Sequence, residues 1–269
     1  MNMKDSQRRL THIECFEGGK YIQVIHHVLP SSELHSHDFF EIEIISNGKG
    51  THILNSESYP IESDMVWLCT PADFHEIILE EPAEYWTILF DANVLSSEYH
   101  QSILNSGAVC KAISPDKFQR LTLATQLLYE EHLTDQNVRP LMEYILDMII
   151  EKDTNSEDAS PIRQAILYTE IYFKNKLTLS SVADQVGLSP TYFGNLFKKE
   201  IGETYINYLN KKRVICAMKL LDSGVSVSTA CFESGFGSLS GFLHTFKKIT
   251  GTSPNDYRKK VLEKKQGLS

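Results

Sequence analysis

The chain lacks the long apolar runs of membrane and secreted proteins. No apolar stretch in its 269 residues approaches the roughly 18–20 residues that are needed to cross a bilayer. The best candidate, Tyr144 to Ile150, is short and is interrupted by Asp147. The amino terminus, residues 1–11, is polar and has no apolar signal core. We therefore expect a cytoplasmic protein without a membrane partner.

Cysteine is scarce and scattered. The five cysteines are odd in number and have no metal-type pairing; they are Cys15, Cys69, Cys110, Cys216 and Cys231. This pattern is typical of reduced thiols rather than of a disulfide framework. Hydrophobic residues make up 42% and charged residues 23% of the chain, as in ordinary globular proteins. The length allows two domains, each with its own core.

Positive charge is sparse in the first 159 residues, which hold 10 Lys and Arg against 27 Asp and Glu, a net charge of −17. Residues 160–269 hold 16 Lys and Arg against 8 Asp and Glu, a net charge of +8. A basic segment attached to an acidic one suits a carboxyl-terminal part that meets phosphates. The alternative is a chance clustering of solvated lysines.

The last third of the chain contains one helical pattern twice, about 49 residues apart. The residues of the first copy and their counterparts in the second are Phe193, Phe197, Lys198, Lys199, Gly202 and Tyr208, then Phe242, Phe246, Lys247, Lys248, Gly251 and Tyr257. A short helical pattern that ends in a glycine, Gly187 or Gly235, precedes each copy. Helix, glycine turn and second helix together predict a helix-turn-helix, here present twice.

The predicted second helix of each copy, which we call the reader helix, begins after Ser189 or Ser238. Seven outward residues are expected to meet base edges: Thr191, Gly194, Asn195, Leu239, Ser240, Leu243 and His244. Six basic residues are expected to contact phosphates: Lys198, Lys199, Arg213, Lys247, Lys248 and Arg258. Each residue alone has the ordinary interpretation of a solvated side chain, but their repetition in register favours double-stranded DNA.

The first part of the chain reads as short strands from about residue 12 to 95, separated by turn residues, which predicts an antiparallel sandwich or barrel. Helical spacing from about 115 to 151 predicts an antiparallel helix pair. This pair either packs on the barrel or forms a dimer seam. Residues 152–160 read as a polar linker, so the predicted domains are 1–151 and 161–262.

Residues 235–242, with Phe246-Lys247-Lys248, residues 251–254 and Tyr257-Arg258, resemble the DNA-binding domain of the AraC/XylS family of bacterial transcription regulators. The resemblance covers about residues 160–260. It implies seven helices that carry two readers for adjacent major grooves of promoter DNA. It also implies activation through contact with RNA polymerase. The family often has arginine where this chain has Asn195 and His244, so its base preference cannot be transferred.

A second resemblance lies near the amino terminus. The stretch from His35 to Glu41 fits much of the first cupin motif, and residues 64–75 resemble the second, with Ala72 where glycine is usual. If His35, His37 and Glu41 lie on one strand, they share a face. In a metal-binding cupin they would hold a divalent metal together with His75.

AraC-family sensor domains also resemble cupins, and that resemblance implies a small-molecule effector pocket rather than a metal. We therefore expect an effector, with a sugar as one candidate, near six residues: His35, His37, Glu41, His75, Tyr85 and Trp86. One unknown strand register decides which of the two aromatic residues faces inward. No metal or other cofactor is expected. A simpler alternative is that the histidines only hydrogen-bond within the barrel.

The predicted fold class is two-domain α+β: an N-terminal cupin-like antiparallel β-barrel with a helical pair, and a C-terminal all-α double helix-turn-helix. The predicted function is that of a homodimeric, effector-responsive transcription activator that is not an enzyme. Two alternatives stay open. One is a metal-binding cupin sensor or enzyme that carries a DNA-binding module, and the other is a DNA-binding protein that responds to no effector.

Overall fold

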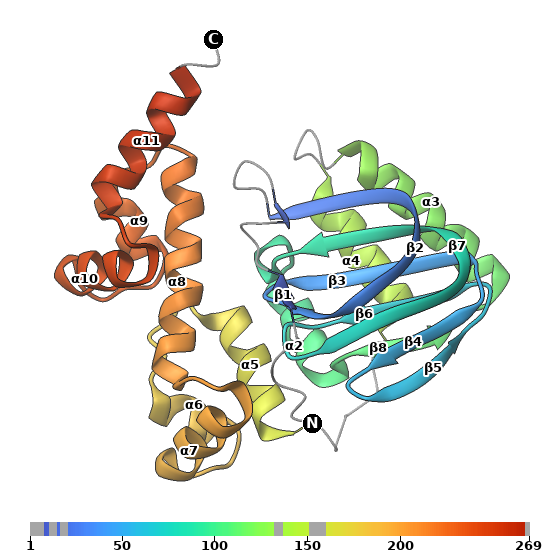
Figure 1. Cartoon of the computed structure of the whole chain (residues 1–269), viewed down its shortest axis with the longest axis horizontal. Coiled ribbons are helices and arrows are strands. Elements are labelled where there is room, and N and C mark those ends of the chain that lie inside the picture. Colours follow the sequence, from blue (N-terminus) through green and yellow to red (C-terminus); the bar gives the residue numbers. More distant parts are fainter. Residues whose placement is uncertain (1–7, 11–14, 17–20, 132–136, 151–159, 267–269) are drawn as a thin grey trace. The chain divides into compact units, whose positions relative to one another are not determined.

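The computed structural model describes residues 8–10, 15–16, 21–131, 137–150 and 160–266 (Figure 1). They divide into two compact units, which we call the N-terminal unit, up to residue 150, and the C-terminal unit, from residue 160. Apart from Ser160, the predicted linker lies outside the described residues. Among the helices in the described ranges, none combines the length and the apolar character that a bilayer span requires.

The N-terminal unit is built on one sheet whose central strand is β7 (Figure 1). Its strands are β1 (Arg8–Leu10), β2 (Ile22–His37), β3 (Phe40–Asn47), β4 (Gly50–Leu54), β5 (Glu57–Ile61), β6 (Met65–Cys69), β7 (Phe74–Phe90) and β8 (Val109–Ala112). One edge of β7 pairs with β2, and the other pairs first with β4 and then with β3. All pairs are antiparallel except β1 with β2. The near-barrel that results confirms the predicted class.

The two faces of this sheet differ in chemistry because successive strand residues point to opposite sides. The outer face is apolar, with Ile42, Ile44 and Ile88 at 0% exposure. Helices α3 (Pro115–Glu131) and α4 (Val138–Ile149) lie against it in Figure 1. The 3₁₀ turn η2 (Ala92–Val94) and helix α2 (Ser97–Ser106) connect β7 to β8. The helix pair therefore packs on its own sheet, which was one of the two expectations.

The inner face of the sheet is the opposite side, and it carries buried polar residues. Glu41 and Glu43 of β3 pair across with Leu89 and Thr87 of β7. An apolar cluster adjoins them on this face, made of Ile45, Ile61, Met65, Trp67, Ile77 and Tyr85. The inner face thus joins ionisable groups to an apolar core, whereas the outer face is almost wholly apolar.

The C-terminal unit is all-α, as predicted. Its helices are α5 (Pro161–Tyr172), α6 (Leu179–Gln185), α7 (Pro190–Ile201), α8 (Tyr205–Asp222), α9 (Val227–Glu233), α10 (Leu239–Thr250) and α11 (Pro254–Gln266). All seven begin after a residue whose hydroxyl accepts a hydrogen bond from the first helical turn: Ser160, Thr178, Ser189, Thr204, Ser226, Ser238 and Ser253. These caps satisfy N–H groups that a helix start otherwise leaves unpaired.

The two helix-turn-helix units, α6–α7 and α9–α10, have matching aromatic cores. Phe197 lies 5.6 Å from Phe193 and from Tyr208, between ring centroids. In the second unit Phe246 lies 5.5 Å from Phe242 and 5.8 Å from Tyr257. The sequence repeat is therefore also a repeat in packing.

Helix α5 is anchored to α8 by a buried polar network. The Lys212 ammonium forms an ion pair with Glu170, and the Tyr208 hydroxyl donates to Glu170 Oε1 at 2.6 Å. Exposure is 6% for Lys212 and 2% for Glu170. A buried pair of this kind tolerates loss of either partner poorly, because the other charge is then left uncompensated.

The turn glycines of the two units have different surroundings. Gly187 has φ +69° and no atom within 4 Å of the place of a Cβ. Gly235 has φ +88°, and a Cβ there would lie 2.8 Å from Phe173 O and from Lys174 Cα. The second turn therefore packs directly on the chain that follows α5, and it needs a glycine for space as well as for backbone conformation.

Candidate functional site

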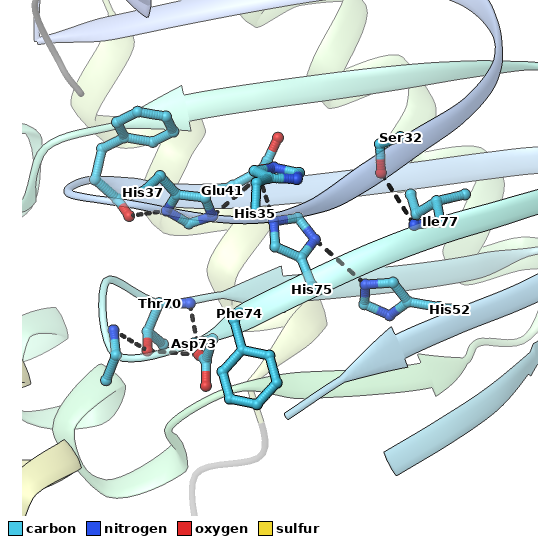
Figure 2. Close-up of polar contacts among 12 residues, drawn as sticks. Ser32, His35, His37, Glu41, His52, Thr70, Asp73, Phe74, His75 and Ile77 are labelled. Carbon is cyan, nitrogen blue, oxygen red and sulfur yellow. Dashed lines mark hydrogen bonds and ion pairs between the residues drawn. The ribbon is translucent and has the colours of Figure 1, made fainter. Parts of the chain in front are cut away.

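Four of the predicted effector residues meet on the inner face (Figure 2). Glu41 Oε2 lies 3.1 Å from His37 Nε2 and 3.2 Å from His75 Nε2. His35 is the cross-strand partner of His75, and their ring centroids are 4.3 Å apart. The structure therefore brings together His35, His37, Glu41 and His75 as one cluster.

These residues do not meet for the predicted reason. His35 and His37 end β2, whereas Glu41 lies on β3 after a change of direction at Asp38 and Phe39. The condition that all three lie on one strand is therefore not met. The actual causes are the pairing of β2 with β7, which places His75 opposite His35, and the pairing of β3 with β6, which places Glu41 opposite Cys69, six residues before His75.

Backbone carbonyls fix how the first two histidines are protonated. His35 Nδ1 lies 2.7 Å from Glu33 O, and His37 Nδ1 lies 2.7 Å from Phe39 O. Each Nδ1 donates to a carbonyl, because a carbonyl oxygen can only accept. The Nε2 atom of each ring is the one left to face the cluster.

The pKa values of the two carboxyl groups in the cluster are shifted in opposite directions. Burial would raise the pKa of Glu41, but hydrogen bonds from His37 and His75 outweigh it and hold this pKa well below the usual value. Glu43 has no such partner, so burial, and then repulsion by Glu41, raises its pKa well above the usual value. The lowered pKa of Glu41 favours its carboxylate form, and the raised pKa of Glu43 favours its protonated form, which can donate a hydrogen bond.

Sequence reasoning missed Glu43 and His52. Glu43 is 5% exposed, and its Oε2 has no hydrogen-bond partner in the described structure. His52 of β4 is 0% exposed, and its Nε2 lies 3.4 Å from His75 Nδ1. Burial, and then His75, lowers the pKa of His52 to about 3, so its ring is neutral. The alternation of polar and apolar residues in both strands was the signal that could have revealed them.

The register of β7 decides between the two predicted aromatic residues. Tyr85 is on the inner face, 2% exposed, with its ring 4.4 Å from that of His27. Trp86 is on the outer face, stacked on His26 at 4.1 Å and meeting Tyr129 of α3 edge-on at 5.6 Å. Trp86 therefore does not belong to the inner-face cluster, which corrects the expectation.

A braced turn positions His75 at the start of β7 (Figure 2). Asp73 Oδ2 accepts from the Thr70 amide at 2.8 Å and from its hydroxyl at 2.6 Å. Asn55 Nδ2 donates to Asp73 Oδ1 at 2.7 Å, and Asn55 Oδ1 accepts from the Phe74 amide at 3.2 Å. These bonds fix the turn that leads into β7, up to the residue before His75.

Most of the predicted DNA-facing residues are exposed. On the two reader helices these are Thr191, Asn195, Lys198, Lys199, Leu239, Ser240, His244, Lys247 and Lys248. Gly194 is partly buried beside Leu179. Leu243 packs against the core of the second unit, so its expected outward direction is wrong. Tyr192, which sequence reasoning did not single out, is 57% exposed near the start of α7.

The two arginines of the predicted set are occupied within the unit. Arg213 is buried, its Nε donates to Phe173 O at 2.9 Å, and its Nη2 donates to Asn175 O at 2.8 Å. Its predicted phosphate contact is therefore withdrawn, because the side chain stabilises the end of α5 instead. Arg258 is partly buried, and its Nη2 donates to Gly224 O at 3.3 Å.

Comparison with known proteins identifies both units. The profile of a helix-turn-helix domain matches residues 182–260, and that of the AraC-like ligand-binding domain matches residues 25–169. The transcriptional activator RhaS of Escherichia coli O81 is 25% identical over 267 residues, which cover 93% of this chain and 96% of RhaS.

Two solved structures illustrate what this chain is similar to. ToxT from Vibrio cholerae is 14% identical over 89% of this chain and 98% of its own, with a TM-score of 0.42. The C-terminal domain of the response regulator AraT from Geobacillus stearothermophilus is 33% identical over 39% of this chain and 88% of its own, with a TM-score of 0.37. With one profile spanning more than half of the sequence and the other spanning both reader helices, the chain belongs to the AraC family of DNA-binding transcription regulators.

Proposed function

We propose that this regulator is an effector-responsive activator in which a small polar molecule binds the inner face of the N-terminal unit. One observation carries the proposal: polar side-chain atoms are buried there without hydrogen-bond partners. The atoms that lack hydrogen bonds in the described structure include Gln23 Oε1, Glu43 Oε2 and His52 Nδ1. RhaS, which is similar over nearly the whole chain, is named an activator.

Unpartnered buried groups favour a ligand with hydroxyl groups. Each such group destabilises the folded state by roughly 1–3 kcal/mol, which a ligand recovers when it supplies the missing hydrogen bond. Glu43 as a neutral acid and Glu41 as a carboxylate offer a donor and an acceptor close together. The hydroxyl groups of a sugar can supply the missing hydrogen bonds and can pair with both the donor and the acceptor. The acyl chain of a fatty acid can do neither.

Burial of this cluster also supports a response to the effector. A ligand reaches Glu43, which is only 5% exposed, when the strands around it move apart. Binding therefore favours a second arrangement of the N-terminal unit over the first, which is what an effector must do to change promoter binding.

The DNA contacts that we propose follow from exposure on the reader helices. Asn195, Ser240 and His244 offer hydrogen-bonding groups to base edges, and Leu239 offers an apolar contact to a thymine methyl group. The lysine pairs Lys198-Lys199 and Lys247-Lys248 lie in the last turns of their helices, where they suit phosphates.

We further propose a homodimer that forms through α3 and recruits RNA polymerase at the promoter. Leu123 and Leu127 are 54% and 53% exposed and lie one helical turn apart, away from the buried stripe that contains Leu121 and Leu128. A Leu123→Glu variant should sediment as a monomer. If it sediments like the parent chain, the dimer does not use this face.

The effector is tested on the full chain by thermal unfolding against a panel of neutral monosaccharides, with a fatty acid for contrast. A sugar at 100 times its Kd should stabilise the protein by about 2.7 kcal/mol and change its affinity for promoter DNA. Glu43→Ala should abolish this stabilisation, whereas Glu84→Ala, at an exposed position of β7, should keep it. Stabilisation by the fatty acid alone, or by no compound, would contradict the proposal.

A further inference from the structure

A second group of side chains converges on the far side of the His75 ring. His52 of β4, Cys69 of β6 and His75 of β7 offer one ligand atom each, and these atoms all lie within 4.8 Å of one another. Exposure is 0%, 0% and 1% respectively. Three strands of one sheet therefore hold two imidazoles and a thiol together, out of contact with water.

The spacing of the two rings is that of two ligands on one ion. His52 Nε2 and His75 Nδ1 are 3.4 Å apart, longer than the usual hydrogen bond of an N–H group. Two imidazole nitrogens at 2.0–2.1 Å from a tetrahedral Zn²⁺ are separated by about 3.3–3.4 Å. The observed separation therefore needs almost no change to accommodate a metal.

Glu41 prepares His75 to act as a ligand through Nδ1. The carboxylate lies 3.2 Å from His75 Nε2, so it faces one nitrogen of the ring. The other nitrogen, Nδ1, faces His52 and is the one placed to bind an ion. A carboxylate, a histidine and a metal in this order form the arrangement that orients histidine ligands in zinc sites.

We propose that His52 Nε2, Cys69 Sγ and His75 Nδ1 bind a divalent ion of the Zn²⁺ class inside the N-terminal unit. Two imidazoles and a thiolate are a donor set that suits Zn²⁺, and a fourth position is left for water or another oxygen ligand. On binding, the Cys69 S–H bond breaks, the sulfur keeps the electron pair and bonds the ion, and the proton passes to solvent. The ion and the proposed effector share His52 and His75, but the ion uses His52 Nε2 and His75 Nδ1, whereas the effector is proposed from His52 Nδ1 and Glu43 Oε2.

One competing ligand set uses the opposite nitrogen of the same ring. His35, Glu41 and His75 also offer atoms within 4.8 Å of one another, and they are the residues that the cupin motif indicates. That set uses His75 Nε2, the atom that lies 3.2 Å from Glu41. It also includes the partly exposed His35 and has no thiol. The first set is therefore favoured, and a spectrum can distinguish them.

The test uses the full chain, reduced and stripped of metal by a chelator, and then titrated with Co²⁺ and Zn²⁺. Co²⁺ should produce a thiolate-to-metal charge-transfer band at about one equivalent, because only the proposed set contains sulfur. Cys69→Ser should remove this band, and Cys69→Ser and His52→Ala should each weaken Zn²⁺ binding by more than about 100-fold. Glu41→Gln should keep the band and weaken binding by about 10–100-fold, as expected for a group that orients a ligand.

Two matched variants complete the test. Cys110→Ser, at a partly buried cysteine outside the set, should keep both the band and the affinity, and so should His35→Ala. Absence of a thiolate band in the parent chain overturns the proposal without any variant. A band that survives Cys69→Ser also overturns it. Loss of Zn²⁺ binding in His35→Ala but not in Cys69→Ser would place the ion at the competing set.

Discussion

Substituting Gly235 by alanine tests how the second helix-turn-helix unit is held against α5. Alanine at φ +88° costs about 1–2 kcal/mol in backbone conformation alone. Its Cβ would also lie 2.8 Å from Phe173 O, so the backbone after α5 must move. Gly187→Ala is the matched control, since Gly187 has φ +69° and open space at the Cβ position.

Moving the Phe173 carbonyl has a further cost, because its oxygen already accepts a hydrogen bond. It accepts from Arg213 Nε at 2.9 Å inside the unit. A hydrogen bond to a charged group contributes about 1.5–3 kcal/mol to stability. We therefore expect Gly235→Ala to destabilise the C-terminal unit by about 3–5 kcal/mol, against about 1–2 kcal/mol for Gly187→Ala.

Two optical signals separate the two units in urea unfolding. The chain has two tryptophans, Trp67 and Trp86, and both lie in the N-terminal unit, so their fluorescence reports that unit alone. Far-ultraviolet circular dichroism reports mainly the helices of the C-terminal unit. Gly235→Ala should shift the dichroism transition and leave the fluorescence transition in place. Equal shifts of the dichroism transition in the two glycine variants would refute the reasoning.

Three other predictions concern the readers and the inner face. Lys198→Ala should lower the slope of log affinity against log salt by about 0.9. Arg213→Ala should destabilise the helices of the C-terminal unit without changing that slope. Binding titrations at several salt concentrations distinguish the two variants. His244→Ala should reduce discrimination between operator and random DNA, and an unchanged ratio of the two affinities would show that the ring reads no base. The pKa of Glu43 is raised in the folded chain, so its contribution to stability is complete below the ordinary value of 4.5 and is lost as pH rises toward the folded pKa. Glu43→Gln should therefore gain stability over the parent chain by about 1.4 kcal/mol per pH unit within that window; parallel curves of stability against pH would disprove the assignment.

The helices of the C-terminal unit could be predicted closely from sequence because their signals are local. A hydroxyl residue before each helix and a glycine after each reader lie within a few positions of the boundary that they determine. Arg213 shows the limit of this approach. Its partners are carbonyl groups 38 and 40 residues earlier in the chain, and no local pattern distinguishes it from a solvated arginine.

The inner face was only partly predictable because strand pairing is set by distant segments. The spacing of the histidines in the sequence indicated a polar cluster, and the members of that cluster do meet. The sequence could not show that β7 extends from Phe74 to Phe90, which joins the second cupin-like stretch to the strand with Tyr85 and Trp86. A change of one residue in that register would exchange the two aromatic residues between the faces.

Tyr85 and Trp86 are consecutive residues, yet one adjoins the buried histidines and the other touches Tyr129 of α3. A β-strand is one residue thick, so a single peptide bond separates these two environments. A displacement of β7 therefore changes the contacts on both sides of the sheet at once. The strand that lines the histidine cluster with one face therefore carries, on its other face, part of the surface on which the helix pair packs.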